Sequence, residues 1–189
     1  MDAHLPTDAT PLSLVIGGTG MLRPAVHTLI ERGHDVAVIA RRPERGAPAA
    51  GTAGRFLPIT GNWREPSSLT DGIRATVQDR RARTVIVWVH DPHRFAVMES
   101  IEAEVAADAT VLHVWGSAGQ DPRRLVPRLD PVDRRSVRHV ALGYVPLGAG
   151  ARWLTDVEIS TAVLRALDTD ERITVAGRIE PWHRRPGLG

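Results

Sequence analysis

The sequence contains no cysteine and no lysine, and it is poor in aromatic residues. Its 189 residues include one tyrosine, two phenylalanines and five tryptophans. The absence of cysteine excludes disulfide bonds and thiol catalysis. The absence of lysine makes all 24 basic residues arginines, which explains a sequence pI of about 10.2 at a formal net charge of only +2. Because 22 acidic residues are interspersed with the arginines, the charge pattern does not favour nucleic-acid binding.

Long apolar runs are also missing. None approaches the roughly 18 residues of a membrane-spanning helix, so no membrane association is expected. The first eleven residues, MDAHLPTDATP, lack the basic start and apolar stretch of a signal peptide. We therefore expect a cytoplasmic protein in which residues 1–11 form a frayed tail.

What the sequence does contain is a regular alternation of short apolar runs and segments of helical periodicity. Strands are predicted at residues 12–16, 36–40, 56–59, 84–90, 110–115, 136–145 and 172–177. Pro58 places the third of these near a sheet edge. Apolar residues at helical spacing predict a first helix from Leu22 to Ile30.

Three further helices are predicted from their apolar spacing and start signals. One carries Leu69, Ile73 and Val77, with Ser67 or Ser68 as its cap. The next has Asp91 as N-cap and Pro92 at its first position, and it reaches about residue 107. The last begins with the capping box of residues 155–158 and runs to about residue 167.

This alternation predicts an α/β fold: a single Rossmann-type, doubly wound and mostly parallel sheet of about seven strands, with helices on both faces. The domain is expected to span residues 12–180, with a C-terminal tail at 181–189. Ligands of such sheets bind at the carboxyl ends of the strands. Residues 17–23, 40–42, 60–63, 89–94, 115–120 and 144–152 should therefore lie along one rim.

A glycine-rich stretch, VIGGTGML, lies between the first strand and the first helix. Gly17, Gly18 and Gly20 let the backbone turn tightly and approach a pyrophosphate, and the first free amides of the helix point at negative charge. The loop is therefore interpreted as a nucleotide-binding loop made by Gly17, Gly18, Thr19, Gly20, Met21 and Leu22. The alternative is a simple glycine-rich turn.

The second strand ends in Ala40-Arg41-Arg42, where an NAD-binding protein normally has an acid for the ribose hydroxyl. Arginine suits a 2′-phosphate, whereas an acid would repel it. The pair therefore favours NADP(H) as the cofactor, with NAD(H) second. The alternative is a solvated pair of arginines.

Six segments, VIGGTGML, VIVWVH, HVWGS, ALGYV, RWLTDVEIS and EPWHRRP, together resemble the short-chain dehydrogenase/reductase superfamily in its small, atypical bacterial branch. The likeness spans Leu12 to Pro186 and implies a Rossmann fold with a nicotinamide cofactor. Typical members carry a Tyr-x-x-x-Lys pair that relays the proton. This chain has no lysine, and its single tyrosine, Tyr144, is followed four residues on by Gly148.

The resemblance also suggests positions for catalysis. Ser117 follows the fifth strand, where the family places a serine that polarises the substrate, and Val89 and His90 close the strand that passes the nicotinamide ribose. A histidine titrates near neutral pH and can serve as a general acid. His90, Ser117 and Tyr144 are therefore the catalytic candidates, with His90 preferred as proton donor. Alternatively, Ser117 is only a serine in a turn, and His90 only ends a strand and caps the next helix.

Further candidates come from other parts of the sequence. Asn62 and Trp63 follow the third strand, where the family contacts adenine; otherwise they form a turn and an anchor. Arg152 could bind an anionic substrate, and Trp153 is assigned to the core. His113 is interpreted as a core histidine, and no spacing among the eight histidines resembles a metal site.

The leading hypothesis is an NADP(H)-dependent reductase of a small carbonyl or imine compound. Two alternatives remain at this point: a non-catalytic NADP(H)-binding sensor, and a non-redox enzyme such as a cyclase or isomerase that reuses the pocket. The expected partner is a small-molecule substrate, and formation of a homo-oligomer is left open.

Overall fold

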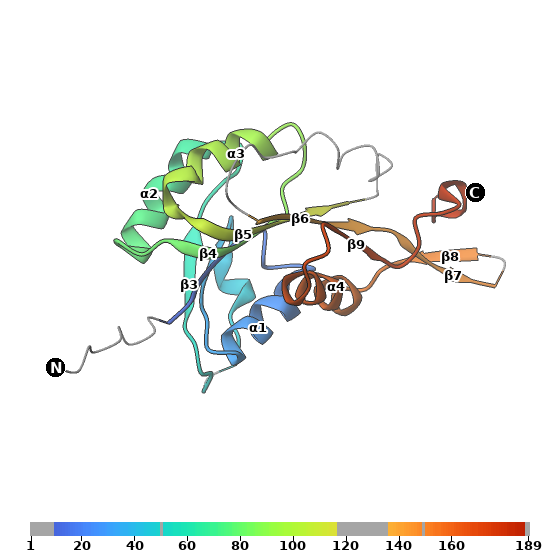
Figure 1. Cartoon of the computed structure of the whole chain (residues 1–189), viewed down its shortest axis with the longest axis horizontal. Helices are drawn as coiled ribbons and strands as arrows, with labels where there is room; N and C mark the ends of the chain where they lie inside the picture. Colours follow the sequence, from blue (N-terminus) through green and yellow to red (C-terminus); the bar gives the residue numbers. More distant parts are fainter. Residues whose placement is uncertain (1–9, 50, 117–135, 149, 188–189) are drawn as a thin grey trace.

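Seven parallel strands form the central sheet of the protein, in the order β3-β2-β1-β4-β5-β6-β9 (Figure 1). The computed structural model describes residues 10–49, 51–116, 136–148 and 150–187. The strands of this sheet are β1 (Leu12–Ile16), β2 (Asp35–Ala40), β3 (Phe56–Thr60), β4 (Ala82–Val87), β5 (Val105–Trp115), β6 (Ser136–Leu142) and β9 (Ile173–Ala176). All six neighbouring pairs are parallel. This arrangement confirms the predicted Rossmann-type sheet, and β3 lies at its edge as Pro58 indicated.

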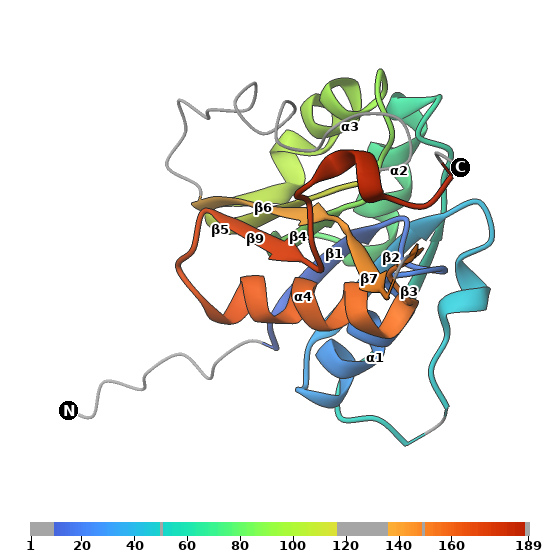
Figure 2. The ribbon, with the colours of Figure 1, turned by 90° about the vertical axis from the view of Figure 1, so that its right-hand side faces the viewer.

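Helices cover both faces of the sheet (Figures 1 and 2). On one face α1 (Arg23–Glu31) packs beside α4 (Asp156–Asp168), and on the other α2 (Pro66–Val77) packs beside α3 (Arg94–Ile101). Two apolar clusters, one on each face, form the core. The predicted apolar stripe of the first helix is buried from Leu22 to Ile30. Short 3-10 turns lie at Pro43–Gly46, Glu102–Glu104 and Trp182–Arg184.

Helix α4 begins with the capping box that the sequence predicted. The Glu158 amide donates to Thr155 Oγ1 at 3.3 Å, and the Thr155 amide donates to the Glu158 carboxylate at 2.8 Å. One turn later, Ser160 Oγ donates to the carbonyl oxygen of Met21 at 2.8 Å. Helix α4 is therefore tied directly to the glycine-rich loop.

Two predicted helix starts are wrong. Helix α2 has Glu65 as its N-cap, and Ser67 and Ser68 lie within its first turn because Pro66, with its fixed φ, takes the first helical position. Helix α3 begins at Arg94, with His93 rather than Asp91 as N-cap, and it ends at Ile101.

The predicted strand at 84–90 is also shorter than expected, because β4 ends at Val87. The Arg94 guanidinium donates to the Val87 carbonyl at 3.3 Å and to the Val114 carbonyl at 2.9 Å. It thereby links the last residue of β4 to the next-to-last residue of β5. The residues after Glu104, which were assigned to a helix up to about 107, belong to β5 because Val105 already pairs with Ala82.

The predicted strand at 136–145 is broken at Gly143. After Gly143 the backbone of Tyr144 pairs with that of Arg178, and a side chain at Gly143 would overlap the Arg178 backbone, so this close approach requires a glycine. Tyr144 starts a second strand, β7 (Tyr144–Leu147), which pairs with β8 (Gly150–Trp153) in an antiparallel hairpin that extends beyond the sheet (Figure 1). The hairpin leaves Trp153 40% exposed, so its assignment to the core is wrong.

Among the described residues, none of the helices combines the length and apolar character that crossing a membrane requires. Residues 1–9 of the predicted tail and the candidate Ser117 lie outside the described residues.

Candidate nucleotide-binding site

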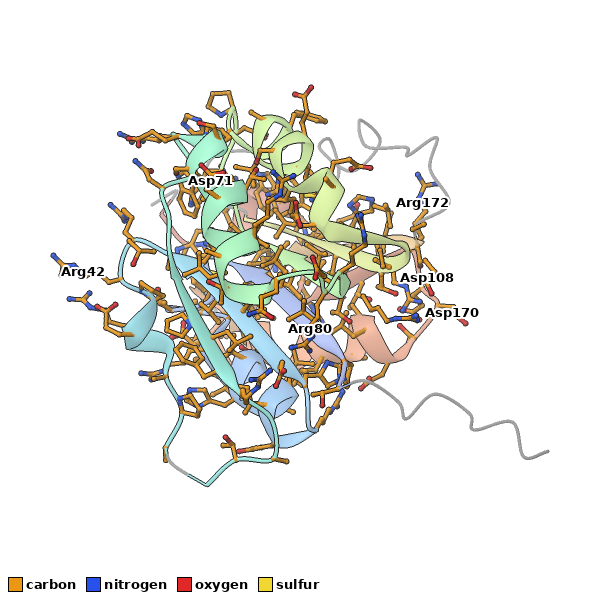
Figure 3. All side chains as sticks on the ribbon, turned by 90° about the vertical axis from the view of Figure 1, so that its left-hand side faces the viewer. Arg42, Asp71, Arg80, Asp108, Asp170 and Arg172 are labelled. Atoms are coloured by element: carbon orange, nitrogen blue, oxygen red, sulfur yellow. The ribbon has the colours of Figure 1, made fainter. Side chains whose placement is uncertain are left out.

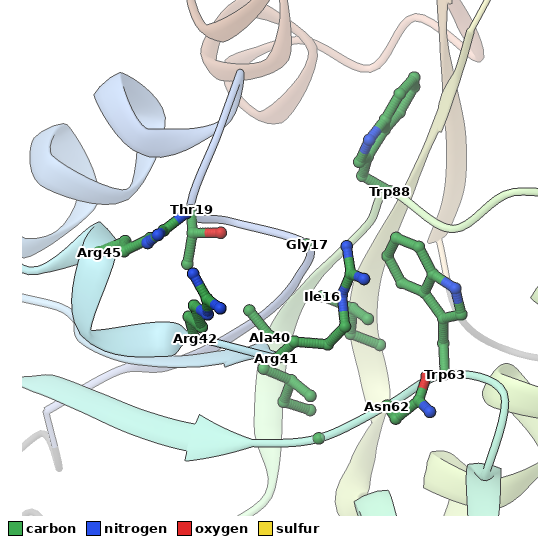
Figure 4. A pocket seen from close by; sticks show the side chains of 12 residues that line it. Ile16, Gly17, Thr19, Ala40, Arg41, Arg42, Arg45, Asn62, Trp63 and Trp88 are labelled. Atoms are coloured by element: carbon green, nitrogen blue, oxygen red, sulfur yellow. The ribbon is translucent and has the colours of Figure 1, made fainter.

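A cavity of about 640 Å³ opens at the carboxyl ends of β1, β2, β3 and β4 (Figure 4). It is lined by Ile16, Gly17, Thr19, Ile39, Ala40, Arg41, Arg42, Arg45, Gly61, Asn62, Trp63 and Trp88. The order of the sheet reverses between β1 and β4, so the cavity lies at the topological switch point. Nucleotides bind at this place in doubly wound sheets.

The three glycines of the loop have three different roles. Gly17 has a φ of +90°, and its amide donates to the Ile39 carbonyl at 2.9 Å, so the chain turns sharply as it leaves β1. A Cβ at Gly18 would lie 2.9–3.2 Å from side-chain carbons of Val15, Val26 and Val38, so this glycine allows α1 to pack closely on the sheet. Gly20 is exposed, and a Cβ there would have no neighbour within 4 Å. The backbone at Gly20 is therefore open to a ligand.

Helix α1 follows this loop without a capping side chain. Its N-cap, Leu22, is a buried core residue, and the first turn contains no acidic residue. The amides of a first helical turn lack partners within the helix, and they carry the positive end of the helix dipole. The N-terminus of α1, next to the cavity-lining Thr19, is suited to an anion.

Among the described residues, three arginines and no acidic residue line the cavity. Arg41 and Arg42 directly follow β2, as the sequence indicated, and both are exposed; Arg42 projects from the body of the protein (Figure 3). Arg45 was missed in the sequence, although it stands in the same RRPER stretch. It is placed by the 3-10 turn Pro43–Gly46, whose last carbonyl is within hydrogen-bonding distance of His27 Nε2 at 3.1 Å. None of the three arginines forms an ion pair with another described residue.

Asn62 and Trp63 follow β3 and lie on the cavity wall across from the glycine loop (Figure 4). The Asn62 side chain also shapes its own turn, since its oxygen accepts from the Arg64 amide at 3.2 Å and its nitrogen donates to Glu65 at 3.3 Å. Trp63 packs against the core cluster while it faces the cavity. Each residue therefore combines the structural role with the position expected for a ligand contact.

The segment after β4 brings a tryptophan to the cavity that the sequence reasoning overlooked. Trp88 lines the cavity, while His90 is exposed and lies outside the lining. The His90 ring is 5.1 Å from the Trp88 ring and 6.1 Å from the Trp63 ring, with edge contacts to both. Val89 is 1% exposed and is not among the described residues that line the cavity, so the structure does not bring it into the site. The sequence feature that could have identified Trp88 is a bulky residue at the end of a buried strand, in VWVH.

Tyr144 lies in a different environment from the one its catalytic assignment needs. It is 1% exposed, and its hydroxyl donates to the Pro181 carbonyl at 2.7 Å. Its backbone exchanges two hydrogen bonds with Arg178, both at 2.8 Å. These contacts make Tyr144 an anchor for the C-terminal segment.

Arg152, the suggested substrate ligand, is engaged by a neighbour. Its guanidinium makes two hydrogen bonds to the Glu158 carboxylate, at 2.7 and 2.9 Å. The hydrogen bonds from Arg152 lower the pKa of Glu158 to about 2 and raise that of the arginine. The pair therefore stabilises the start of α4.

A buried polar cluster supports the sheet beside the cavity. Arg94, 3% exposed, lies in hydrogen-bonding distance of His113, whose ring stacks on His139. Burial lowers the pKa of Arg94 to about 10, that of His113 to about 3 and that of His139 to about 4. His113 is 4% exposed, which confirms its interpretation as a core histidine.

No protein-family model and no curated protein matches the sequence. Solved structures do match. A 3-ketoacyl-ACP reductase from Sinorhizobium meliloti 1021 superimposes with a TM-score of 0.67 at 12% identity, over 88% of this chain and 98% of that one. A MalC reductase/Diels-Alderase from Malbranchea aurantiaca gives 0.65 at 13% identity, over 89% and 95%. A short-chain dehydrogenase/reductase mutant from Serratia marcescens gives 0.63 at 18% identity, over 88% and 97%.

At these identities the likeness shows the fold. The chain has the Rossmann-type fold of short-chain dehydrogenase/reductase structures, as the resemblance of its motifs implied.

Proposed function

We propose that this protein is an NADP(H)-dependent oxidoreductase that reduces a small carbonyl or imine compound. The observation that carries the proposal is the set of three arginines in the cavity at the end of β2, where the described part of the chain contributes no acidic residue. An acid at this point would accept a hydrogen bond from the 2′-hydroxyl of NAD. Arginines bind the 2′-phosphate of NADP through charge-assisted hydrogen bonds.

The cavity and the glycine loop beside it together offer a matching contact for each part of the adenosine half of the cofactor. The exposed backbone at Gly20 and the first amides of α1 would hold the pyrophosphate. Arg41, Arg42 and Arg45 would hold the 2′-phosphate, and Asn62 with Trp63 would hold the adenine. When bound, the nicotinamide supplies the hydride, and the chain supplies binding and orientation.

The proton of the reaction is assigned to His90. Its imidazole is exposed at the rim of the cavity, against Trp88 and Trp63. The sequence has no lysine to form a tyrosine–lysine pair, and the Tyr144 hydroxyl is engaged with Pro181. We therefore propose that His90, or a water molecule it holds, exchanges the proton with the substrate, and that Ser117 orients the substrate oxygen or nitrogen.

The names of the structural neighbours support the direction of the reaction. Two of the three are described as reductases, one of a 3-ketoacyl-ACP and one that is also a Diels-Alderase. The name reductase/Diels-Alderase also illustrates that a protein of this fold can carry out a non-redox reaction, a Diels–Alder reaction. The proposal for this chain rests on the arginines and the glycine loop.

The test is the binding of NADPH and NADH to the wild type and to the Arg41→Ala/Arg42→Ala double variant, measured by calorimetry. Charge-assisted contacts contribute about 1.5–3 kcal/mol, so NADPH should bind about 10- to 150-fold more weakly to the variant. NADH, which lacks the 2′-phosphate, should change by less than about threefold on the same reasoning.

The matched control is the Arg81→Ala/Arg83→Ala variant. It removes two exposed arginines at the amino end of β4, and the cavity lies at the carboxyl end. It should leave the affinity for NADPH unchanged. Equal losses of NADPH and NADH affinity in the Arg41/Arg42 variant would show that the arginines do not distinguish the cofactors.

A second candidate is a nucleotide-binding module without redox activity. The observation that favours it is the extent of the cavity: within the described residues its lining comes from the ends of β1 to β4 and the loops after them, not from β5 or β6. NADPH binding without NADPH consumption, across a panel of aldehydes, ketones and imines, would establish this candidate over the reductase.

A further inference from the structure

Trp88 occupies the switch point of the sheet. Its amide donates to the Ile16 carbonyl at 3.0 Å, which holds the residue at the end of β1 although β4 has already ended at Val87. The side chain is half-buried and packs against the core cluster of the α1/α4 face. The position of the indole is therefore determined by both the sheet and the core.

The indole lies across the carboxyl ends of three neighbouring strands. A Cβ built on Gly17, at the end of β1, would lie 3.1 Å from Trp88 Cδ1. A Cβ built on Gly116, at the end of β5, would lie 2.7 Å from Trp88 Cη2. The ring thus extends from β1 past β4 to β5, and the two glycines leave the space that it fills.

A dinucleotide bound to a doubly wound sheet crosses from one half of the sheet to the other at this switch point. The cavity holds the arginines and the adenine contacts on the β1–β2–β3 side, and Trp88 is its wall toward β5 (Figure 4). The adenosine half of a nucleotide therefore has an open place. The nicotinamide half would have to enter the space where the indole now lies.

We propose that Trp88 is a specificity-determining residue that closes the site beyond the pyrophosphate. With the indole in place, the site takes an adenosine nucleotide that carries a 2′-phosphate. A complete dinucleotide binds only when the indole turns aside. This inference rests on the proposed function, because it assumes that the adenosine half of NADP occupies the arginine side of the cavity.

The experiment compares adenosine 2′,5′-bisphosphate with NADP⁺ by calorimetry, on the wild type and on Trp88→Ala. The wild type should bind the bisphosphate at least as tightly as NADP⁺. If the indole is turned aside for about a tenth of the time, its removal strengthens NADP⁺ binding about tenfold. The bisphosphate does not reach the indole, so its affinity should stay within about twofold on the same basis.

A second variant and a control guard against loss of folding. Trp88→Leu keeps an apolar side chain against the core but is too short to reach Gly116, so it should show the same gain for NADP⁺. Trp153→Ala removes an exposed indole of the β7–β8 hairpin and should change neither ligand. Thermal unfolding of each variant identifies any that does not fold.

Tryptophan fluorescence gives an independent reading of the same event. NADP⁺ should change the emission of the wild type more than the bisphosphate does, because only NADP⁺ displaces the indole. The difference should vanish in Trp88→Leu and persist in Trp153→Ala.

The outcomes separate the two proposals. Binding of both ligands with an unchanged affinity ratio in the Trp88 variants overturns the role of Trp88 and leaves the nucleotide site in place. Weaker NADP⁺ binding in both folded variants also overturns it, since the indole would then be a binding platform. If neither ligand binds the wild type, the proposed nucleotide site fails, and the role of Trp88 fails with it.

Discussion

The guanidinium carbon of Arg94 lies 3.8 Å from the centre of the Trp115 ring. The last paired residues of β4 and β5 are Val87 and His113, and just there Arg94 donates to the carbonyls of Val87 and Val114. A buried cation thus closes the gap between two strands and is stabilised by backbone dipoles and an aromatic face. Because Arg94 bonds the last residue of β4, it fixes the point from which the cavity-lining segment departs.

Replacing Arg94 with methionine should destabilise the protein. The substitution removes two buried hydrogen bonds from a charged donor, and each such bond contributes about 1.5–3 kcal/mol. We expect a loss of about 3–6 kcal/mol in the free energy of unfolding, measured by urea denaturation. Arg64→Met, at an exposed arginine, is the control and should change it by less than about 0.5 kcal/mol. An equally small loss at Arg94 would contradict this role.

Stability should fall as the pH drops from 6.5 toward 4. Burial and the nearby Arg94 charge lower the pKa of His113 to about 3 and that of His139 to about 4, from 6.5. In this range the unfolded chain binds protons that the folded protein does not, so acid favours unfolding. Each histidine contributes up to about 1.4 kcal/mol per pH unit.

The variant His139→Gln tests this dependence. A glutamine oxygen can replace Nδ1 as acceptor for the Trp115 indole N–H, now 3.1 Å away, but it does not titrate. The slope of stability against pH between 6.5 and 4.5 should become shallower, as read from urea unfolding at several pH values. His183→Gln, at an exposed histidine, should leave the slope as it is, and a matching slope in both variants would refute the assignment.

Gly18 and Gly20 should respond differently to alanine. At Gly18 the new methyl group would press on three valine side chains, and such overpacking costs about 1–3 kcal/mol. At Gly20 it meets nothing, so stability should change by less than about 0.5 kcal/mol. Thermal denaturation compares the two, and similar losses at both sites would argue against these separate roles.

Gly20→Asp should leave the protein folded and weaken its binding of NADPH. It places a negative charge where the proposed pyrophosphate lies, and about 1.4 kcal/mol of repulsion already weakens binding tenfold. Calorimetry with NADPH measures the change, and Gly20→Ala is the control for size. Unchanged affinity in a folded Gly20→Asp protein would place the phosphates elsewhere.

Substitutions at His90 and Tyr144 should distinguish a catalytic residue from an anchor of the C-terminal segment. With a substrate that consumes NADPH, His90→Asn should lower kcat by about 10²–10⁴-fold, the usual contribution of a general acid. Tyr144→Phe removes the hydrogen bond to Pro181, so it should speed proteolysis of the C-terminal segment and leave kcat nearly unchanged. An inactive Tyr144→Phe beside a normal His90→Asn would reverse the two roles.

Much of the fold follows from local sequence. The buried strand at 12–16, the apolar stripe from Leu22 to Ile30 and the capping box at 155–158 appear where the sequence predicts them. These features depend on side-chain spacing and on hydrogen bonds within one turn, so neighbouring residues suffice to specify them. The glycine loop and the Arg41–Arg42 pair reach the cavity for the same reason: the carboxyl ends of parallel strands share one edge.

Contacts between distant segments decided the other features of the fold and of the site. The end of β4 depends on Arg94, which lies seven residues further on and also bonds β5. The break at Gly143 depends on the Arg178 backbone, and the environment of Tyr144 on Pro181. Trp88 reached the cavity because Gly17 and Gly116, nearly a hundred residues apart in sequence, leave space for its ring. Sequence spacing therefore predicted the central parts of most strands and helices and the edge of the sheet at which the cavity opens. Tertiary packing decided where several of these elements end and which side chains face the cavity, because close packing depends on atoms that only the folded chain brings together.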